Sequence, residues 1–127
     1  MCWDSDLART PSNGQVGLSV TIPIALADGA TATTKYTMPW KIRITDVWIV
    51  KTAGAGGLSD TVQLKNGATA ISDAMSINVA DQAIVRAATL DDAQTDIASG
   101  ADLSITKTKA SVANVACIVY VRGIRIA

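Results

Sequence analysis

Apolar residues occupy every second position from Val16 to Leu26, and Gly, Ser, Thr, Pro and Ala fill the positions between them. This period of two predicts a β-strand with one buried face. Pro23 lies within the strand and has no backbone N–H to donate to a neighbouring strand. We therefore expect this strand to lie at the edge of a sheet or to carry a bulge at the proline.

The segment 33–50 predicts two further strands that are divided near Pro39. The apolar residues of the second piece fall into two alternating sets: Ile42, Ile44, Trp48 and Val50 in one, and Val47 and Ile49 in the other. Either a bulge near Thr45-Asp46 shifts the alternation, or the far end of the strand is covered on both faces. Trp48 is expected to belong to the core.

Turn residues separate the extended runs. Asp28-Gly29 marks a turn after the first strand, and the Gly-rich segment 54–57 marks a loop after the third. Residues 61–71 predict a β-hairpin with Asn66-Gly67 at its tip, because both central residues of a type I′ turn need positive φ.

Residues 73–100 have a less regular pattern. Ala83–Ala88 fits a strand or a helix. Asp91-Asp92 and the residues up to Gly100 fit one capped helical turn or a loop. A strand is again expected at 103–109.

The final strand, from about 114 to 122, is apolar on both faces. One face holds Val115, Cys117, Val119 and Val121, and the other holds Ala116, Ile118 and Tyr120. In a two-layer sandwich each sheet buries only its inner face, so this strand needs a second cover. The cover is either a loop or the N-terminal arm of the same chain, or a neighbouring subunit.

Together these segments predict an all-β protein: an antiparallel β-sandwich, jelly-roll-like, with about 7–9 short strands. The composition agrees, because Ala, Val, Ile and Thr are abundant and every acidic residue is Asp. Asp favours turns, whereas the branched side chains of Val, Ile and Thr pack well on a sheet. The 127 residues suffice for a single β-sandwich domain at 15–127, preceded by an irregular N-terminal arm at 1–14.

Catalytic chemistry has little support in this chain. It contains no histidine, which is the commonest general base and metal ligand, and no Walker A or Gly-x-Ser-x-Gly motif. We expect neither an enzyme nor a cofactor. Cys117 is expected to be a small core residue, and Cys2 a free thiol. Asp91, Asp92 and Asp96 fit solvated turns better than a calcium site, because their spacing differs from that of an EF-hand loop.

Eleven basic and eleven acidic residues give a formal net charge of zero. This balance argues against broad electrostatic binding of nucleic acid or of an anionic membrane. No apolar run reaches the roughly 20 residues that span a bilayer, and the polar N-terminus is unlike a secretory signal. Basic residues beside the expected strands fit a solvated sheet face or an interface with an acidic partner: Lys35, Lys41, Arg43, Lys51, Lys107 and Lys109.

Aromatic residues lie where a core is not expected. Trp3 is on the arm, and Tyr36 and Trp40 flank the bend at Pro39. Trp and Tyr are frequent anchors of protein interfaces. With the second face of the last strand, they define a candidate interface: Trp3, Tyr36, Trp40, Ile118 and Tyr120. Packing of Trp3 on its own domain and sugar stacking on Trp3 or Trp40 are the alternatives.

The runs Met38–Trp48 and Asp60–Gly67, joined by the Gly/Ala loop, resemble small head decoration (cement) proteins of tailed bacteriophages, and Ala113–Arg122 is similar in style. The resemblance extends over about residues 16–125. It implies a jelly-roll or related protomer that forms trimers at three-fold positions of the outer capsid. There such proteins bridge capsomers and stabilise the expanded shell against the pressure of its DNA. The resemblance carries no catalytic residue.

On this interpretation the protein is made in the bacterial host cytoplasm and resides on the outer capsid surface of the virion. Its partners are further copies of itself and the major capsid protein, with no direct contact to nucleic acid or membrane. Two alternatives stay open: a phage tail, fibre or baseplate protein, and a carbohydrate-binding jelly-roll module.

Overall fold

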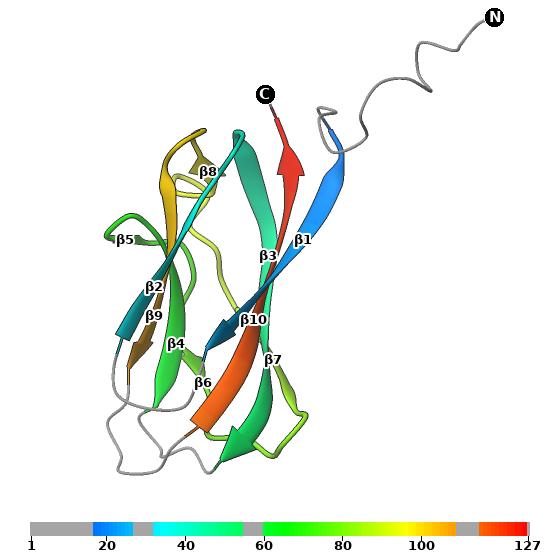
Figure 1. Ribbon diagram of the computed structural model, residues 1–127, viewed down its shortest axis with the longest axis vertical. Coiled ribbons are helices and arrows are strands. Elements are labelled where there is room, and N and C mark those ends of the chain that lie inside the picture. The colour runs from blue at the N-terminus through cyan, green and yellow to red at the C-terminus, as the bar shows by residue number, and fades with distance from the viewer. Residues whose placement is uncertain (1–16, 27–31, 55–59, 109–114, 127) are drawn as a thin grey trace, which may run out of the picture.

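The computed structural model describes residues 17–26, 32–54, 60–108 and 115–126. Within these ranges the chain forms ten strands and no helix, so the all-β prediction is confirmed. The strands build two antiparallel sheets that pack as a β-sandwich (Figure 1). Three of the strands have only two residues each, which is why more strands occur than the sequence predicted.

Each sheet contains five strands. Sheet A has the order β1 (Ser19–Leu26), β10 (Val115–Arg125), β3 (Ile42–Gly54) and β7 (Ile84–Arg86), and β8 (Asp96–Ile97) also pairs with β3. Sheet B has the order β2 (Ala32–Thr37), β9 (Asp102–Thr108), β4 (Thr61–Asn66) and β5 (Thr69–Ala70), and β6 (Met75–Ser76) also pairs with β4.

The chain changes sheet after each of β1, β2, β3, β6, β8 and β9. Within sheet A the first strand pairs with the last, in an unbroken register from Ser19↔Ile124 to Leu26↔Cys117. The predicted antiparallel β-sandwich is thus confirmed, whereas its strand order could not be predicted from the sequence. β1 ends the strand order of sheet A, so Pro23 lies on an edge strand, as expected from its missing N–H.

The core fills the space between the sheets with apolar side chains from both. β4 shows the alternation of buried and half-buried positions. Val62 and Leu64 are fully buried, whereas Thr61 and Gln63, each directly before one of them, are half-buried. Cys117 is 1% exposed, which confirms it as a small core residue. Removal of this apolar surface from water is the main force that holds the two sheets together.

A β-bulge in β3 resolves the conflict between the two alternating sets of that strand. Asp46 pairs with Arg122 and Ile44 pairs with Gly123, so Thr45 is the extra residue without a register partner, and its hydroxyl donates to the Arg122 carbonyl at 3.3 Å. The extra residue moves Val47 to the inner face and Trp48 to the outer face. The predicted bulge is confirmed, and the placement of Trp48 in the core was wrong.

The hairpin predicted at 61–71 is present, but its turn is displaced by one residue. Asn66 still belongs to β4 and pairs with Thr69, so Gly67 and Ala68 form the two-residue loop. Gly67 has φ of 62°, the conformation that the first central residue of a type II′ turn requires. One positive φ is needed at the tip, and glycine supplies it.

The irregular segment 73–100 is made of short strands and turns. Ile84–Arg86 is a strand, which decides the ambiguity over Ala83–Ala88. Where one helical turn was a possibility, the structure has a turn: the Asp91 carboxylate accepts the N–H of Ala93 at 3.0 Å, and the Asp91 carbonyl accepts that of Gln94 at 2.8 Å.

Several predictions lie outside the described residues. These are the N-terminal arm at 1–14 with Cys2 and Trp3, the turn at Asp28-Gly29 and most of the Gly-rich loop at 54–57.

Candidate functional site

The outer face of sheet A carries two rungs of side chains across four strands. Residues directly opposite in an antiparallel pair point to the same side of the sheet. One rung joins Pro23, Tyr120, Trp48 and Arg86, and the next joins Ala25, Ile118, Val50 and Ile84. We call the seven uncharged members of these rungs the outer apolar face: Pro23, Ala25, Trp48, Val50, Ile84, Ile118 and Tyr120.

This face is accessible on the side away from the core. Ile84 is 62% exposed, and Pro23 and Ala25 at the opposite margin are exposed as well. The four residues between them are half-buried, because each is flanked by neighbours on both sides. A continuous apolar patch on a sheet surface is typical of a contact site for another protein.

Aromatic stacking fixes the centre of the outer apolar face. The Trp48 and Tyr120 rings have centroids 5.6 Å apart and planes inclined by 12°. The Arg86 guanidinium lies 4.8 Å from the centroid of the Trp48 ring and also pairs with the Asp46 carboxylate. Rings held from two sides form a rigid, preorganised surface, which lowers the entropy lost on binding.

A polar rung borders the apolar ones. Thr21, Arg122 and Asp46 are opposite one another on β1, β10 and β3. Arg122 is exposed, whereas Asp46 is half-buried beneath Arg86. An apolar centre with a polar margin is the usual anatomy of a protein interface.

The candidate residues predicted from sequence separate into different places. Ile118 and Tyr120 lie together on the outer apolar face. Tyr36 is 38% exposed on β2, the edge strand of sheet B, opposite Leu103. Trp40 is half-buried against the core, with the Arg125 guanidinium 5.5 Å from its ring centroid. Trp3 is outside the described residues.

Sequence reasoning missed five members of this face: Pro23, Ala25, Trp48, Val50 and Ile84. The signal for Trp48 and Val50 was the break in alternation within β3, because a bulge at Thr45 necessarily sends them to the outer side. No local pattern identifies Ile84, since its place beside Val50 depends on the pairing of β7 with β3.

Two titratable groups of the described ranges have shifted pKa values with structural causes. Asp96 accepts bonds from Arg43 at 2.7 and 3.0 Å, and this pairing holds the pKa of the carboxyl below its ordinary value. Burial raises the pKa of the Cys117 thiol. Among the described residues no three His, Cys, Asp or Glu side chains are grouped to hold a metal ion. In that part of the chain no helix is long and apolar enough to cross a membrane.

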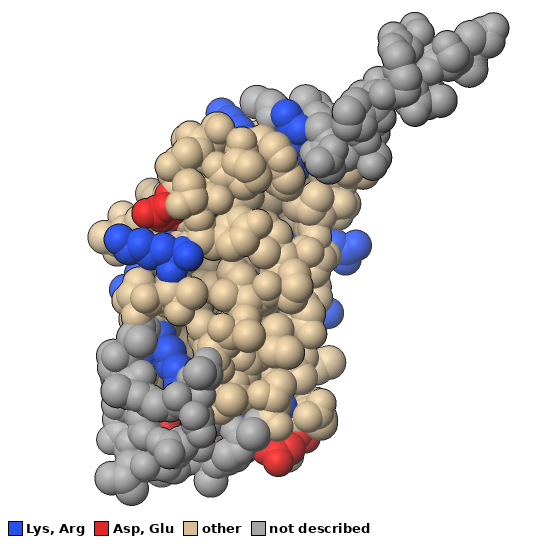
Figure 2. Space-filling view, in the orientation of Figure 1, with Lys and Arg blue, Asp and Glu red and all other residues tan. Residues whose placement is uncertain are grey.

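Charged groups do not form a broad single-sign surface on the side of the molecule shown in Figure 2. Uncharged residues cover the middle of that side, and Lys, Arg and Asp side chains lie towards its margins. This distribution accords with the zero net charge of the chain.

The fold has a counterpart among solved structures. A chain from the cyanophage Pam1 capsid asymmetric unit superposes with a TM-score of 0.53 and 16% sequence identity, over 96% of each chain. At this identity the likeness establishes a shared fold. No protein-family profile matches the chain. No curated protein matches it either.

Proposed function

We propose that this protein is a structural component of a bacteriophage virion, and within that class a capsid decoration protein without catalytic activity. The observation that carries the proposal is the fold likeness, over 96% of both chains, to a chain of the cyanophage Pam1 capsid asymmetric unit. The sequence resemblance to phage head decoration proteins supports the same class on separate grounds.

The outer apolar face supplies the contact that such a role needs. Trp48 and Tyr120 form a stacked aromatic centre, and Ile84 is an apolar side chain left 62% exposed beside it. A few residues, with Trp and Tyr prominent among them, account for most of the binding energy in protein interfaces. We assign this face to contacts with further copies of the chain in a trimer, or with the major capsid protein.

Repetition makes modest contacts sufficient. A trimer on a three-fold position of the shell binds through three equivalent sites at once, so the effective concentration of the second and third contacts is high. On the outer capsid surface the bound trimer would link neighbouring capsomers and oppose their separation under the pressure of packaged DNA.

Reconstitution tests the proposal. The protein is mixed with expanded shells of the major capsid protein encoded in the same genome, and binding is followed by sedimentation and electron microscopy. We expect regular occupancy of the outer surface and a trimer in light scattering. Ile118→Asp and Ile84→Asp should each reduce shell occupancy, trimer formation or both. Ala74→Asp, at an exposed position outside the face, should reduce neither shell occupancy nor trimer formation.

A monomeric protein that leaves expanded shells bare would falsify the decoration role. If micrographs of virions instead locate the protein on the tail or baseplate, it is a tail, fibre or baseplate protein.

A further inference from the structure

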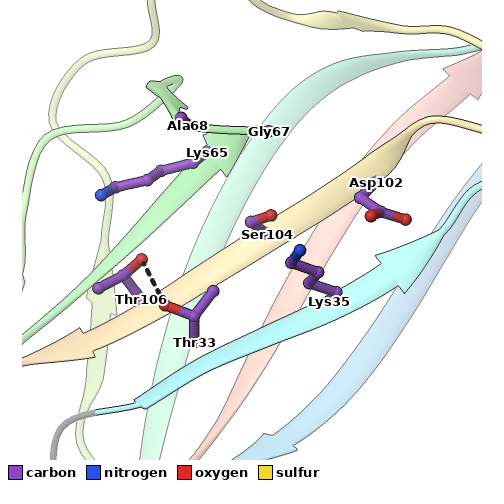
Figure 3. Close-up of a pocket in the computed structure, with 8 residues that line it drawn as sticks. All are labelled: Thr33, Lys35, Lys65, Gly67, Ala68, Asp102, Ser104 and Thr106. Atoms are coloured by element: carbon purple, nitrogen blue, oxygen red, sulfur yellow. Dashed lines mark hydrogen bonds between the residues drawn. The ribbon is translucent and has the colours of Figure 1, made fainter.

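A polar hollow of about 450 Å³ lies on the outer face of sheet B, on the side opposite the outer apolar face. Its floor is β9, and its walls come from β2, β4 and the turn after β4 (Figure 3). Six of its lining residues carry polar side chains: Thr33, Lys35, Lys65, Asp102, Ser104 and Thr106.

The centre of the hollow is a rung of three residues. Ser104 on β9 is directly opposite Lys35 on β2 and directly opposite Lys65 on β4. Because neighbouring strands are about 4.8 Å apart, the two lysines start from backbone positions about 10 Å apart. Because the Ser104 side chain between them is small, it leaves open space between the two lysines.

The polar groups of this rung lack partners within the described part of the chain. Neither Lys35 nor Lys65 forms an ion pair there. Ser104 is 2% exposed, and its hydroxyl has no hydrogen bond to another described residue. Asp102 is the one carboxylate among the described lining residues, and it accepts a bond from the Thr37 hydroxyl at 2.8 Å.

We propose that this hollow binds the carboxylate of an Asp or Glu side chain from a partner protein. The carboxylate rests above Ser104, accepts a bond from its hydroxyl and is paired with the ammonium groups of Lys35 and Lys65. A carboxylate only accepts hydrogen bonds, and this rung offers donors that are otherwise unused. Such charge-assisted bonds are stronger than neutral ones.

The two lysines reach the carboxylate in different ways. Figure 3 shows the Lys35 ammonium close to Ser104, whereas the Lys65 side chain extends away from it across the outer surface. Lys65 closes over the bound group by rotation about its side-chain bonds. A lysine has a flexible four-carbon stem, so this movement requires no change in the strands.

The lining favours an acidic side chain over other ligands. None of the described residues that line the hollow is aromatic, so they offer a sugar no ring on which to stack. Asp102 at one end repels an extended polyanion such as nucleic acid. The volume of about 450 Å³ accommodates a whole side chain with its neighbouring backbone. In a virion the acidic residue would come from a shell subunit or a neighbouring copy; that source, but not the binding itself, rests on the proposed function.

Titration of the isolated protein tests the site without any capsid. The ¹⁵N-labelled protein is titrated with the capped peptide Glu-Glu-Glu, with capped Gln-Gln-Gln and with inorganic phosphate, and amide shifts are recorded. We expect Glu-Glu-Glu to shift the amides of Lys35, Ser104 and Thr106 and the neutral peptide to leave them unchanged. Lys35→Gln and Lys65→Gln should each weaken binding about fivefold or more.

Two further variants separate binding from stability. Lys41→Gln removes an exposed lysine outside the hollow and should bind as the parent does. Ser104→Ala should weaken binding while the free energy of unfolding stays equal or rises, because a buried hydroxyl without a partner is removed. No shift with Glu-Glu-Glu, equal binding by both Lys→Gln variants, or binding of phosphate alone would each overturn the proposal. None of these results depends on whether the protein decorates a capsid.

Discussion

Trp48 of β3 and Tyr120 of β10 stack on the outside of sheet A, with ring centroids 5.6 Å apart. They are 72 positions apart in the sequence, and they meet because Trp48 pairs directly with Tyr120 across the two strands. The bulge at Thr45 makes this contact possible, since without it Trp48 would point into the core. The stack is therefore both a structural bond between strands and the centre of the candidate interface.

A double-mutant cycle should detect this contact. We expect Trp48→Leu and Tyr120→Leu to be coupled by about 0.5–1.5 kcal/mol in the free energy of unfolding, the usual contribution of an aromatic pair. Urea denaturation provides the measurement. Trp48→Leu combined with Ile97→Val, on β8, should instead be additive. Coupling no larger for the aromatic pair than for this control would contradict the assignment.

Gly123 should tolerate no side chain. A Cβ at this position would lie 2.7 Å from the Arg43 carbonyl oxygen and 2.7 Å from two carbons of the Ile42 side chain. Gly123→Ala should lower the free energy of unfolding by about 1–3 kcal/mol, the range found when a packed core is overfilled. Arg122→Ala, at the exposed neighbouring position, should change it by less than about 0.5 kcal/mol. Equal midpoints for the two variants in urea would count against this packing.

The Arg43–Asp96 pair should make a small contribution to stability that depends on pH. The Arg43 guanidinium lowers the pKa of Asp96, so the folded state binds the proton less tightly than the unfolded state does. The contribution is present above the unfolded pKa of about 4 and is lost as the pH falls through the lower folded value. Both side chains are exposed, so solvent and salt weaken the pair.

Asp96→Asn isolates this contribution. Its unfolding free energy should lie slightly below that of the parent at neutral pH, and the difference should vanish in acid and in high salt. A difference that grows below pH 4 would have the wrong sign for a carboxyl with a lowered pKa.

Lys51 should hold the turn before β7 against β3. Its side chain is only 5% exposed, its ammonium donates to the Val79 carbonyl at 2.7 Å, and it lies 3.3 Å from the Asp81 carboxylate. Lys51→Met keeps the stem but leaves that carbonyl without its donor, which should cost about 1–3 kcal/mol. Hydrogen exchange should then accelerate at the amide of Gln82, which bonds to the Lys51 carbonyl.

Asp81→Asn is the matched control for Lys51. Asp81 is 61% exposed, so loss of its charge should change stability by less than about 0.5 kcal/mol. If both variants destabilise equally, the ion pair and not the bond to Val79 dominates.

The Cys117 thiol should be unreactive in the folded protein. Burial raises its pKa, and the nearby Lys107 offsets this only in part, so little thiolate exists at neutral pH. In a Cys2→Ser variant we expect no reaction with a disulfide reagent until urea unfolds the chain. Rapid labelling without denaturant would show that this strand opens readily.

Much of the sandwich could be predicted from local patterns. The alternation in β1 and β4, the edge position of Pro23 and the two-sided apolar character of β10 all follow from which residues are apolar at every second position. The hairpin tip was predicted one residue too early, because Asn66 completes the ladder with Thr69 instead of entering the turn. Local propensity identifies a turn but leaves its register to the strands.

The sequence by itself determined that the chain is all-β, that β10 is apolar on both faces, and that the apolar alternation in β3 changes phase within the strand. Only the tertiary structure decided that Trp48 and Ile84 join Tyr120 on one face, and that Lys35 and Lys65 flank Ser104 on the other. The reason is physical: alternation is a property of each strand, whereas these neighbours are created by pairing between strands that are distant in sequence.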